Sequence, residues 1–362
     1  MSANSFGSAL HVTTFGESHG VALGVVVDGL EPGIPIDVQE LRRMMERRRP
    51  GANALGTARK EQDEVSILSG MFQGLTTGAP LAMEIRNGDQ KSSDYDEIAG
   101  LYRPGHADWT WQQKFGIRDW RGGGRSSGRE TSSRVAAGAI AMQILKLKGI
   151  GIVAGTVRIG DVAASRRDWD VAPSNPLNCP DEQAAIGMQE RIEAARKAQD
   201  SVGGIIECIA TGLPPGLGEP VFDKLDAKIA QAMLSIGAVK GIEFGDGFSC
   251  ALSSGSRFND EMALDGNGKP MFLTNHAGGV LGGMSSGAPL VFRIAVKPTP
   301  SISLPQRTMD LDGRERIVEV HGRHDPCVCP RAVVVVEAMA AITILDAWYT
   351  AFGRVPRPSD IR

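Results

Sequence analysis

The chain of 362 residues is long enough to bury a large core, and length alone suggests about two domains or one large domain with insertions. Its net charge of -3 excludes a global attraction to nucleic acid or to anionic membranes, so any affinity for anions must come from local basic clusters. No apolar run reaches the ~18–20 residues of a membrane span, and the five cysteines lack a disulfide-framework spacing, which favours a cytoplasmic protein with reduced thiols.

Hydrophobic patterning predicts a strand and a capped helix near the start of the chain. Residues 21–28 form a continuous apolar run, which predicts a buried strand that ends at Gly29. The next helix is expected to begin after Asp37, its N-cap, with Glu40 at the capping-box position. It is expected to end at Arg49, because a Pro-Gly pair follows directly.

The remaining predicted elements mix strands and helices. Strands are expected at residues 65–68, 81–85, 205–210 and 290–296. Helices are expected at residues 132–147, 182–200, 222–236 and 332–348. Because their order shows no strict βαβ rhythm, it favours an α+β fold of layered sheets and helices over a doubly wound parallel sheet.

The most informative segment for chemistry spans residues 103–134. Residues 103–108 place an arginine and a histidine around a rigid Pro-Gly turn, and three consecutive glycines at 122–124 precede arginines, serines and a predicted helix. Backbone N–H groups, a helix dipole and arginine side chains together form a natural cradle for phosphate or carboxylate groups. No Walker A spacing is present. An RNA-binding Arg-Gly loop is the alternative, and the acidic net charge counts against it.

Three further polar segments each have a functional and a structural interpretation. In the Glu-Ser-His triplet at 17–19, His19 either acts as acid, base or anion donor or lies in a solvent-facing turn. The arginines at 47–49 either face a pocket or oppose the dipole at a helix end. Two Gly-Gly pairs within residues 275–287 either admit a flat ligand to the backbone or form turns between strands.

The last polar segments lie near the C-terminus. Residues 297–303 offer a cation and hydroxyl groups on a stretch that prolines stiffen. In the Arg-His-Asp run at 323–325, Asp325 has the chemistry of a base, and Arg323 that of an anion contact. A Cys-x-Cys pair follows, but no second pair has ligand spacing, so no metal site is predicted.

Taken together, these segments resemble the motifs of the chorismate synthase family. They stand in the family's order over almost the whole chain, and five in sequence are specific where one alone is not. The matching stretches are Phe-Gly-Glu-Ser-His-Gly (15–20) running on to Val-Val-Val-Asp-Gly (25–29), Arg-Pro-Gly-His-Ala-Asp (103–108), Gly-Gly-Gly-Arg-Ser-Ser-Gly-Arg-Glu-Thr (122–131), Asn-His-Ala-Gly-Gly (275–279) and Gly-Arg-His-Asp-Pro-Cys (322–327).

The resemblance implies a compact β-α-β sandwich with antiparallel sheets, and it implies a lyase. The implied reaction converts 5-enolpyruvylshikimate 3-phosphate to chorismate by anti-1,4-elimination of phosphate and the C6 pro-R hydrogen, the last step of the shikimate pathway to aromatic amino acids. It also implies reduced FMN, which lends electron density without net redox change. A flavin oxidoreductase is the alternative enzyme class, but no Gly-x-Gly-x-x-Gly loop supports it.

Matching positions carry the family's residue roles onto this sequence. The implied catalytic residues are His19 facing the leaving phosphate, His106 facing the reduced flavin, and Asp325 assisting proton movement at flavin N5. The implied substrate-anion contacts are Arg48, Arg49, Arg129, Arg134 and Arg323. The implied flavin-binding positions are Arg125, Ser126, Ser127, Gly237, Ala238, Gly282, Lys297, Pro298, Thr299, Pro300, Ser301 and again Arg323.

The resemblance also implies the organisation of the whole protein. We expect a single chorismate synthase domain over residues 1–362 with no flavin reductase domain, so that an external flavin reductase supplies reduced FMN. We expect a cytoplasmic homotetramer with no nucleic-acid or membrane partner. Two positions depart from the family pattern: Ala54 stands where a basic residue is common, and Gly237 stands where asparagine is common.

Overall fold

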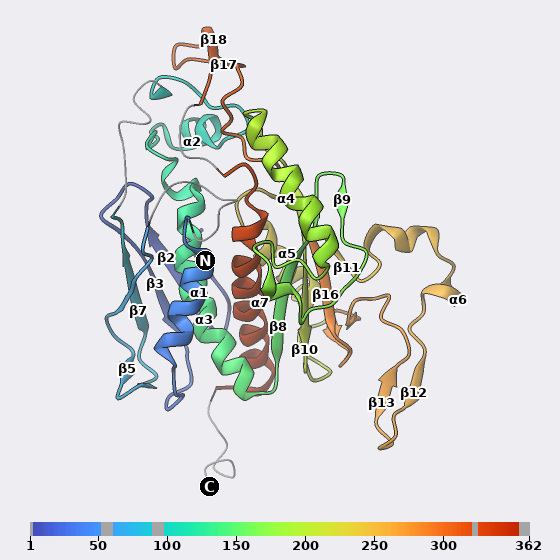
Figure 1. Ribbon diagram of the computed structural model, residues 1–362. Coiled ribbons are helices and arrows are strands. Elements are labelled where there is room, and N and C mark those ends of the chain that lie inside the picture. The colour runs from blue at the N-terminus through green and yellow to red at the C-terminus, as the bar shows by residue number, and fades with distance from the viewer. Residues whose placement is uncertain (1–2, 52–60, 89–97, 321–324, 355–362) are drawn as a thin grey trace.

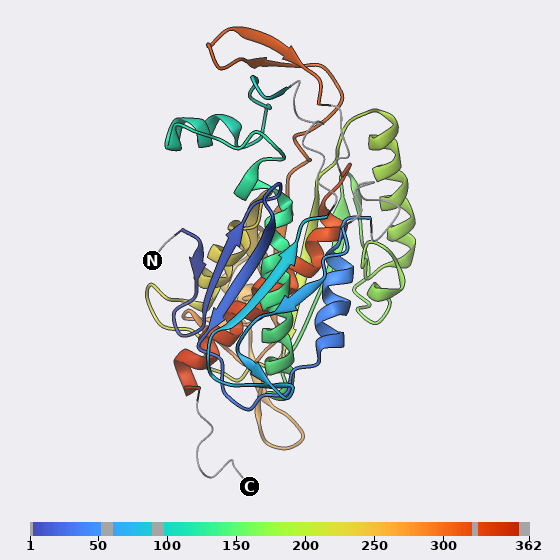
Figure 2. The same ribbon diagram turned by 90° about the vertical axis from the view of Figure 1, so that its left-hand side faces the viewer.

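The computed structural model describes residues 3–51, 61–88, 98–320 and 325–354, and it contains two five-stranded antiparallel sheets with helices between them (Figures 1 and 2). The first sheet has the order β1 Ser5–Phe6, β2 His11–Gly16, β3 Ala22–Asp28, β7 Leu81–Arg86 and β4 Val65–Ile67. The second has the order β11 Val239–Phe244, β16 Leu290–Val296, β10 Gly204–Thr211, β8 Gly151–Ile159 and β9 Val162–Ala163.

Helices fill the layer between the sheets. Helix α3 (Thr131–Leu147) contacts β2, β3 and β7 on one side and β8 on the other, and α7 (Cys329–Phe352) packs against α3, β8 and β10. Helix α1 (Val38–Arg48) packs on α3 and α7, and α5 (Leu225–Leu234) packs on α7 and β11. The α+β class and the β-α-β sandwich predicted from the sequence are therefore confirmed.

The remaining elements lie at the periphery of the sandwich. Helix α4 (Glu182–Lys197) packs on β8 and β9, and α2 (Asp108–Phe115) lies beyond the upper end of the helix layer in Figure 1. The short elements are β5 Met71–Phe72, β6 Leu75–Thr76, β12 Met262–Leu264, β13 Pro270–Phe272, β14 Val280–Leu281, β15 Met284–Ser285, β17 Gln306–Met309, β18 Glu315–Val318, α6 Gly255–Phe258 and the 3-10 turns Gly124–Ser126, Gly128–Glu130, Ala172–Ser174 and Gly247–Leu252.

The N-cap predicted for the first helix is present, but the capping box is not. The Asp37 side chain accepts a hydrogen bond from the Gln39 N–H at 2.7 Å, as the N-cap prediction requires. Glu40 pairs with Arg43 instead of reaching back to the cap. The helix ends one residue earlier than predicted, with Arg49 as its C-cap.

Several element boundaries and one loop prediction are wrong. The helix predicted over residues 222–236 begins only at Leu225, and Phe222 is 90% exposed. The helix predicted from residue 332 begins at Cys329, which is buried. Strand β2, which precedes the predicted strand at 21–28, was not predicted, although its exposed and buried side chains alternate. The turn-rich stretch at 70–80 holds the β5–β6 hairpin.

Helix α7 is the one helix in the described part of the chain that is long and apolar enough to cross a membrane. However, 83% of its most apolar stretch is buried inside the protein, as expected for a core helix. The N-terminal ends of α3 and α7 and the C-terminal end of α1 meet at the same end of the helix layer (Figures 1 and 2). This end carries residues from several of the predicted site segments, among them Arg48, Arg129 and Asp325.

Candidate active site

The three consecutive glycines form a left-handed loop against which two histidines pack. The φ angles of Gly122, Gly123 and Gly124 are 64°, 91° and 52°, a region that L side chains rarely adopt. A Cβ atom on Gly122 would lie 2.6 Å from Nδ1 of His19, and one on Gly123 would lie 2.6 Å from Cε1 of His106. Glycine is therefore required twice here, and the two predicted catalytic histidines lie against adjacent residues of one loop.

His106 belongs to a buried network of charged side chains. Its Nδ1 lies 3.1 Å from Oδ1 of Asp108. The Asp108 carboxylate also accepts two hydrogen bonds from Arg103, from Nε to Oδ2 and from Nη2 to Oδ1, each at 2.8 Å. Arg118 Nη1 lies 3.5 Å from the same carboxylate. Nη2 of Arg103, which can only donate, also lies 3.1 Å from Nδ1 of His106, so Asp108 favours a proton on Nδ1 whereas Arg103 favours the tautomer with the proton on Nε2.

Burial and charge set the pKa values within this network. Burial is the largest influence on His106 and lowers its pKa below the ordinary value, although the hydrogen bond to Asp108 opposes the shift. Burial would raise the pKa of Asp108, but hydrogen bonds from Arg103 and His106 hold it far below its usual range. At neutral pH the imidazole is neutral and the carboxylate is ionised.

His19 is buried at the turn between β2 and β3, with only 7% of its surface exposed. Its Nδ1 lies 3.1 Å from the Ser18 hydroxyl, and Ser18 is also buried. Burial would raise the pKa of Asp119, but hydrogen bonds from Arg121 lower it below its ordinary value, and the positive charge that His19 carries when protonated acts in the same direction. The structure thus rejects the solvent-facing turn that the sequence allowed as an alternative for His19.

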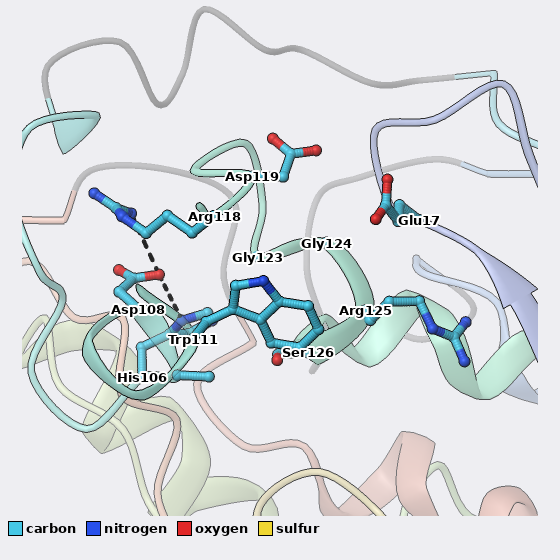
Figure 3. A pocket seen from close by; sticks show the side chains of 11 residues that line it. Glu17, His106, Asp108, Trp111, Arg118, Asp119, Gly123, Gly124, Arg125 and Ser126 are labelled. Atoms are coloured by element: carbon cyan, nitrogen blue, oxygen red, sulfur yellow. Dashed lines mark hydrogen bonds and ion pairs between the residues drawn. The ribbon is translucent and has the colours of Figure 1, made fainter. Parts of the chain in front are cut away.

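Two cavities that share lining residues lie beside the glycine loop, and Figure 3 shows the smaller of them. The smaller has room for about one water, and His106, Asp108 and Trp111 line it together with Arg125 and Ser126. The larger has a volume of about 550 Å³, within the range of small-molecule sites. Its lining residues are Glu17, Trp111, Ile117, Arg118, Asp119, Trp120 and Arg121.

The arginines of the glycine loop are engaged within the protein. Arg125 turns toward β2, where it donates to the Gly16 carbonyl at 3.0 Å and to the Thr14 hydroxyl at 2.7 Å (Figure 3). Arg121 pairs with Asp119 at 2.9 Å. These contacts brace the loop, and they count further against an Arg-Gly loop that binds RNA.

Two of the predicted substrate arginines converge on one aspartate. Arg48 donates from Nη1 to Oδ2 of Asp63 at 2.6 Å, and Arg129 donates to Oδ1 of the same carboxylate. Arg48 is 1% exposed and Arg129 is 3% exposed. Burial lowers the pKa of Arg48 to about 10, and the two guanidinium groups hold the pKa of Asp63 low against the effect of burial.

The other predicted substrate arginines lie elsewhere. Arg49 is exposed at the end of α1, and Arg323 lies outside the described residues, as does Ala54. Arg134 pairs with Glu130 at 2.9 Å and donates to the Ser235 hydroxyl at 2.6 Å, beside Gly237. Arg134 is thus placed beside the predicted flavin positions rather than with Arg48.

Asp325 is connected to Arg48 by Arg331, a residue that the sequence did not indicate. Its Oδ2 is 2.5 Å from Nη1 of Arg331, and Arg331 Nε donates to the Arg48 carbonyl at 3.4 Å. The structure thus brings Asp325 near Arg48. No motif marked Arg331 or Asp63, which follow the predicted site residues Asp325 and Arg49 by six and 14 positions respectively.

The predicted flavin segment after β16 adjoins the His106 turn. The Lys297 ammonium donates to the Gly105 carbonyl at 2.5 Å, and a Cβ atom on Gly105 would lie 3.2 Å from Cβ of Pro300. The Lys297 N–H donates to the Ala238 carbonyl at 2.9 Å. The buried Thr299 hydroxyl has no hydrogen-bond partner within the described ranges.

Other predicted flavin positions are less closely grouped. Ser126 is exposed, and Ser127 accepts a hydrogen bond from the Arg129 N–H at 3.3 Å. Pro298 is exposed and Ser301 is buried, both in the segment after β16. Gly282 lies in the β14–β15 turn beside the N-terminal end of α5, whereas Gly237 follows its C-terminal end, about 15 Å away along the helix. The structure does not bring Gly282 together with the others.

Comparison with known proteins shows the family to which the chain belongs. The family model described as chorismate synthase matches residues 10–349. A chorismate synthase of Desulfatibacillum aliphaticivorans is 54% identical over 96% of this chain and 95% of its own, and one of Methylobacterium radiotolerans is 52% identical over 98% of this chain and 99% of its own. A solved structure described as chorismate synthase has a TM-score of 0.75 at 29% identity and covers 96% of this chain and 93% of its own. The chain is therefore an enzyme that belongs to the chorismate synthase family.

Proposed function

We propose that this protein converts 5-enolpyruvylshikimate 3-phosphate to chorismate and phosphate with the help of reduced FMN and without net redox change. The observation that carries the proposal is the contact of His19 and His106 with adjacent glycines of one loop, together with the position of His106 in the wall of the smaller cavity. The family membership supports the shikimate-pathway reaction, and the cofactor follows from that membership.

The residues present fit a flavin mononucleotide. The unpartnered Thr299 hydroxyl and the Lys297 ammonium are suited to the phosphate and hydroxyl groups of such a ligand. Trp111 and Trp120 at the larger cavity offer flat apolar surface to a ring system. Gly237 stands where asparagine is common in the family, so one side-chain hydrogen bond is lost here. The space around its Cβ position is open, so the site is not blocked. Reduced FMN, when bound, supplies electron density that assists departure of the phosphate.

The chain's own residues then handle anions and protons. In this proposal His19 donates a hydrogen bond or proton to the leaving phosphate, and the buried Ser18 hydroxyl fixes the orientation of its ring. His106 exchanges a proton with the bound ligand, while Asp108 and Arg103 hold its ring through Nδ1. Asp325 assists proton removal, and Arg331 holds its carboxylate in place. Arg48 and Arg129 are the proposed contacts for substrate anions.

We extend the proposal to the whole protein. Residues 1–362 act as one domain, and an external flavin reductase supplies the reduced FMN. The enzyme works as a cytoplasmic homotetramer with no nucleic-acid or membrane partner. The many exposed apolar side chains of the segment around α6 and the β12–β13 hairpin, among them Phe248, Leu252, Met262 and Leu264, support association between chains.

The test is an anaerobic assay with reduced FMN and 5-enolpyruvylshikimate 3-phosphate. The expected result is stoichiometric release of phosphate and chorismate, with the flavin still reduced at the end. Replacement of His106 or Asp325 by alanine is expected to slow turnover by ~10²–10⁴-fold, the usual contribution of general acid–base groups. Absence of both products from a folded wild-type protein would show that the proposed reaction is wrong. Wild-type rates in both variants would show that the assigned catalytic residues are wrong.

A further inference from the structure

The Asp63 carboxylate is enclosed by the two arginines proposed to contact substrate anions. Each carboxylate oxygen receives one guanidinium, Oδ2 from Arg48 and Oδ1 from Arg129, and the Asp63 side chain is fully buried. Two arginine side chains that converge on two oxygens are the arrangement that proteins use to bind a carboxylate or phosphate ligand. Here the protein supplies the anion itself.

The other donors of the two arginines are also directed into the protein. Arg48 donates from Nη2 to the Gly128 carbonyl at 2.9 Å and from Nε to the Thr131 hydroxyl at 3.3 Å. Arg129 donates from Nε to Asn87 at 2.8 Å, and its Nη2 lies 3.6 Å from Glu61. With exposed fractions of 1% and 3%, neither guanidinium offers a surface on which an external anion can land.

A substrate anion can therefore reach this arginine pair only if Asp63 leaves it. Both anions cannot occupy the space together, because like charges in a buried position repel strongly. Nor can Asp63 simply be absent, because Arg48 also faces the nearby charge of Arg331 and burial already disfavours its charged form. The arginine pair needs one anion at all times, and Asp63 meets that need in the described structure.

We propose that Asp63 is an internal placeholder for an anionic group of the substrate, exchanging with a carboxylate or phosphate when substrate binds. The inference rests on the proposed function, since it assumes that Arg48 and Arg129 contact the substrate. The backbone agrees with an exchangeable position: the φ angle of Asp63 is 51°, a left-handed conformation that most L residues rarely adopt. Release from the arginines frees the backbone to leave it.

The test compares anion binding by the wild type, an Asp63→Asn variant and a Glu64→Gln control. The asparagine keeps the shape of the side chain and removes the competing charge, whereas the exposed Glu64 gives the same change of charge at the next residue. Calorimetry measures the Kd of 5-enolpyruvylshikimate 3-phosphate, and thermal unfolding measures stabilisation by inorganic phosphate. We expect 5-enolpyruvylshikimate 3-phosphate to bind the Asp63→Asn variant with a Kd about tenfold lower than its Kd for the wild type. This factor applies if Asp63 occupies the position between the two arginines about nine-tenths of the time in the wild type.

Inorganic phosphate is expected to raise the Tm of Asp63→Asn more than that of the wild type, and the control is expected to behave as the wild type in both measurements. An Asp63→Asn variant that binds phosphate and substrate equally well or less well would overturn the inference, because Asp63 would then only fix the arginines in place. If wild-type protein binds phosphate but not 5-enolpyruvylshikimate 3-phosphate, the proposed function fails, and the phosphate comparison still decides the role of Asp63.

A second variant covers the case in which Asp63→Asn does not fold. Asp63→Ala leaves a space of carboxylate size between the arginines, which acetate can fill. We expect acetate to restore the folded protein and to compete with 5-enolpyruvylshikimate 3-phosphate, so that added acetate weakens substrate binding. Acetate that restores folding without weakening substrate binding would show that the two anions occupy different positions, and the placeholder role would be wrong.

Discussion

At the scale of single residues, the protonation of His106 depends on four neighbouring influences. Burial lowers the pKa of the imidazole most, and the positive charges of Arg103 and Lys297 lower it further. Asp108 acts in the opposite direction, through its hydrogen bond and its negative charge. Because these influences differ in sign, the pKa of His106 can be moved in both directions by single substitutions.

Two substitutions test this balance by NMR titration of the His106 ring. Asp108→Asn removes the negative charge that favours the imidazolium, so the pKa of His106 is expected to fall below its wild-type value. Lys297→Met removes a positive charge that disfavours the imidazolium, so the pKa is expected to rise. Shifts of the same sign in both variants would contradict the network described for His106.

The glycine loop gives a second prediction at this scale. Gly123→Ala would place a methyl group against His106 in a backbone region that costs an alanine about 1–2 kcal/mol. Displacement of the imidazole by about 1 Å is expected to reduce kcat by about 10²-fold in the anaerobic assay. Gly128→Ala is the control, because nothing lies within 4 Å of that Cβ position. Equal kcat values for the two variants would mean that the loop does not position His106.

The sequence predicts the chemistry of this site better than its contacts. His19 and His106 each stand in a polar motif that the sequence shows, and the structure brings both against one loop. Asp63 stands in no motif, and its neighbours Gln62 and Glu64 are exposed, so nothing local indicates a buried acid. Its role depends on Arg129, which is 66 positions away in the sequence, and such pairings follow from the tertiary fold alone.

At the scale of elements, the helix layer depends on a close crossing of α3 and α7. A Cβ atom on Gly138 would overlap Cβ and Cα of Ala338, so the two backbones approach as closely as glycine allows. Glycine in the middle of a helix costs roughly 0.5–1 kcal/mol relative to alanine. The close packing of two core helices, which also fixes the start of α3 beside the site, offsets that cost.

This crossing predicts that replacement of Gly138 by alanine destabilises the protein, whereas helix propensity alone predicts that it stabilises the protein. Gly138→Ala is expected to lower the free energy of unfolding by about 1–3 kcal/mol in urea denaturation, because the added methyl group overpacks the crossing. Gly187→Ala in α4 is the control. There the nearest atom is a Val162 methyl at 3.3 Å, and propensity makes the change neutral or stabilising. A Gly138→Ala variant as stable as the wild type would contradict the close crossing.

Element prediction succeeded where hydrophobic patterning is strong and failed where it is not. The strand at residues 290–296 has the predicted bounds because buried and exposed side chains alternate along it. Strand β8 went unpredicted because Gly151 and Gly155 interrupt its pattern. The structure explains Gly155, because a Cβ atom there would collide with the Asn178 carbonyl. The glycine that this close contact requires thus interrupts the hydrophobic pattern of β8, so the sequence does not predict this interior strand of the second sheet.

At the scale of the whole molecule, a segment near the start of the chain is hydrogen-bonded to the last helix. Asp346 near the end of α7 is buried and accepts hydrogen bonds from the backbone N–H groups of Ser8, Ala9 and Leu10 at 2.7–2.9 Å. At the opposite end of the helix layer, segments from all three thirds of the chain form the candidate site, with His19 and His106 from the first, the Gly122–Gly124 loop from the second and Asp325 from the last. The order of motifs along the sequence indicates the family, but the distances between them in space arise only from the packing of both sheets around α3 and α7.

The central claim is that flavin and substrate share one site beside the Gly122–Gly124 loop. The most direct measurement is an equilibrium titration of FMN by fluorescence, with and without 5-enolpyruvylshikimate 3-phosphate. If the ligands share one site and each completes the surroundings of the other, substrate is expected to lower the Kd of FMN by at least about tenfold, a coupling of about 1.4 kcal/mol. An FMN Kd that is the same with saturating substrate as without it would contradict the account.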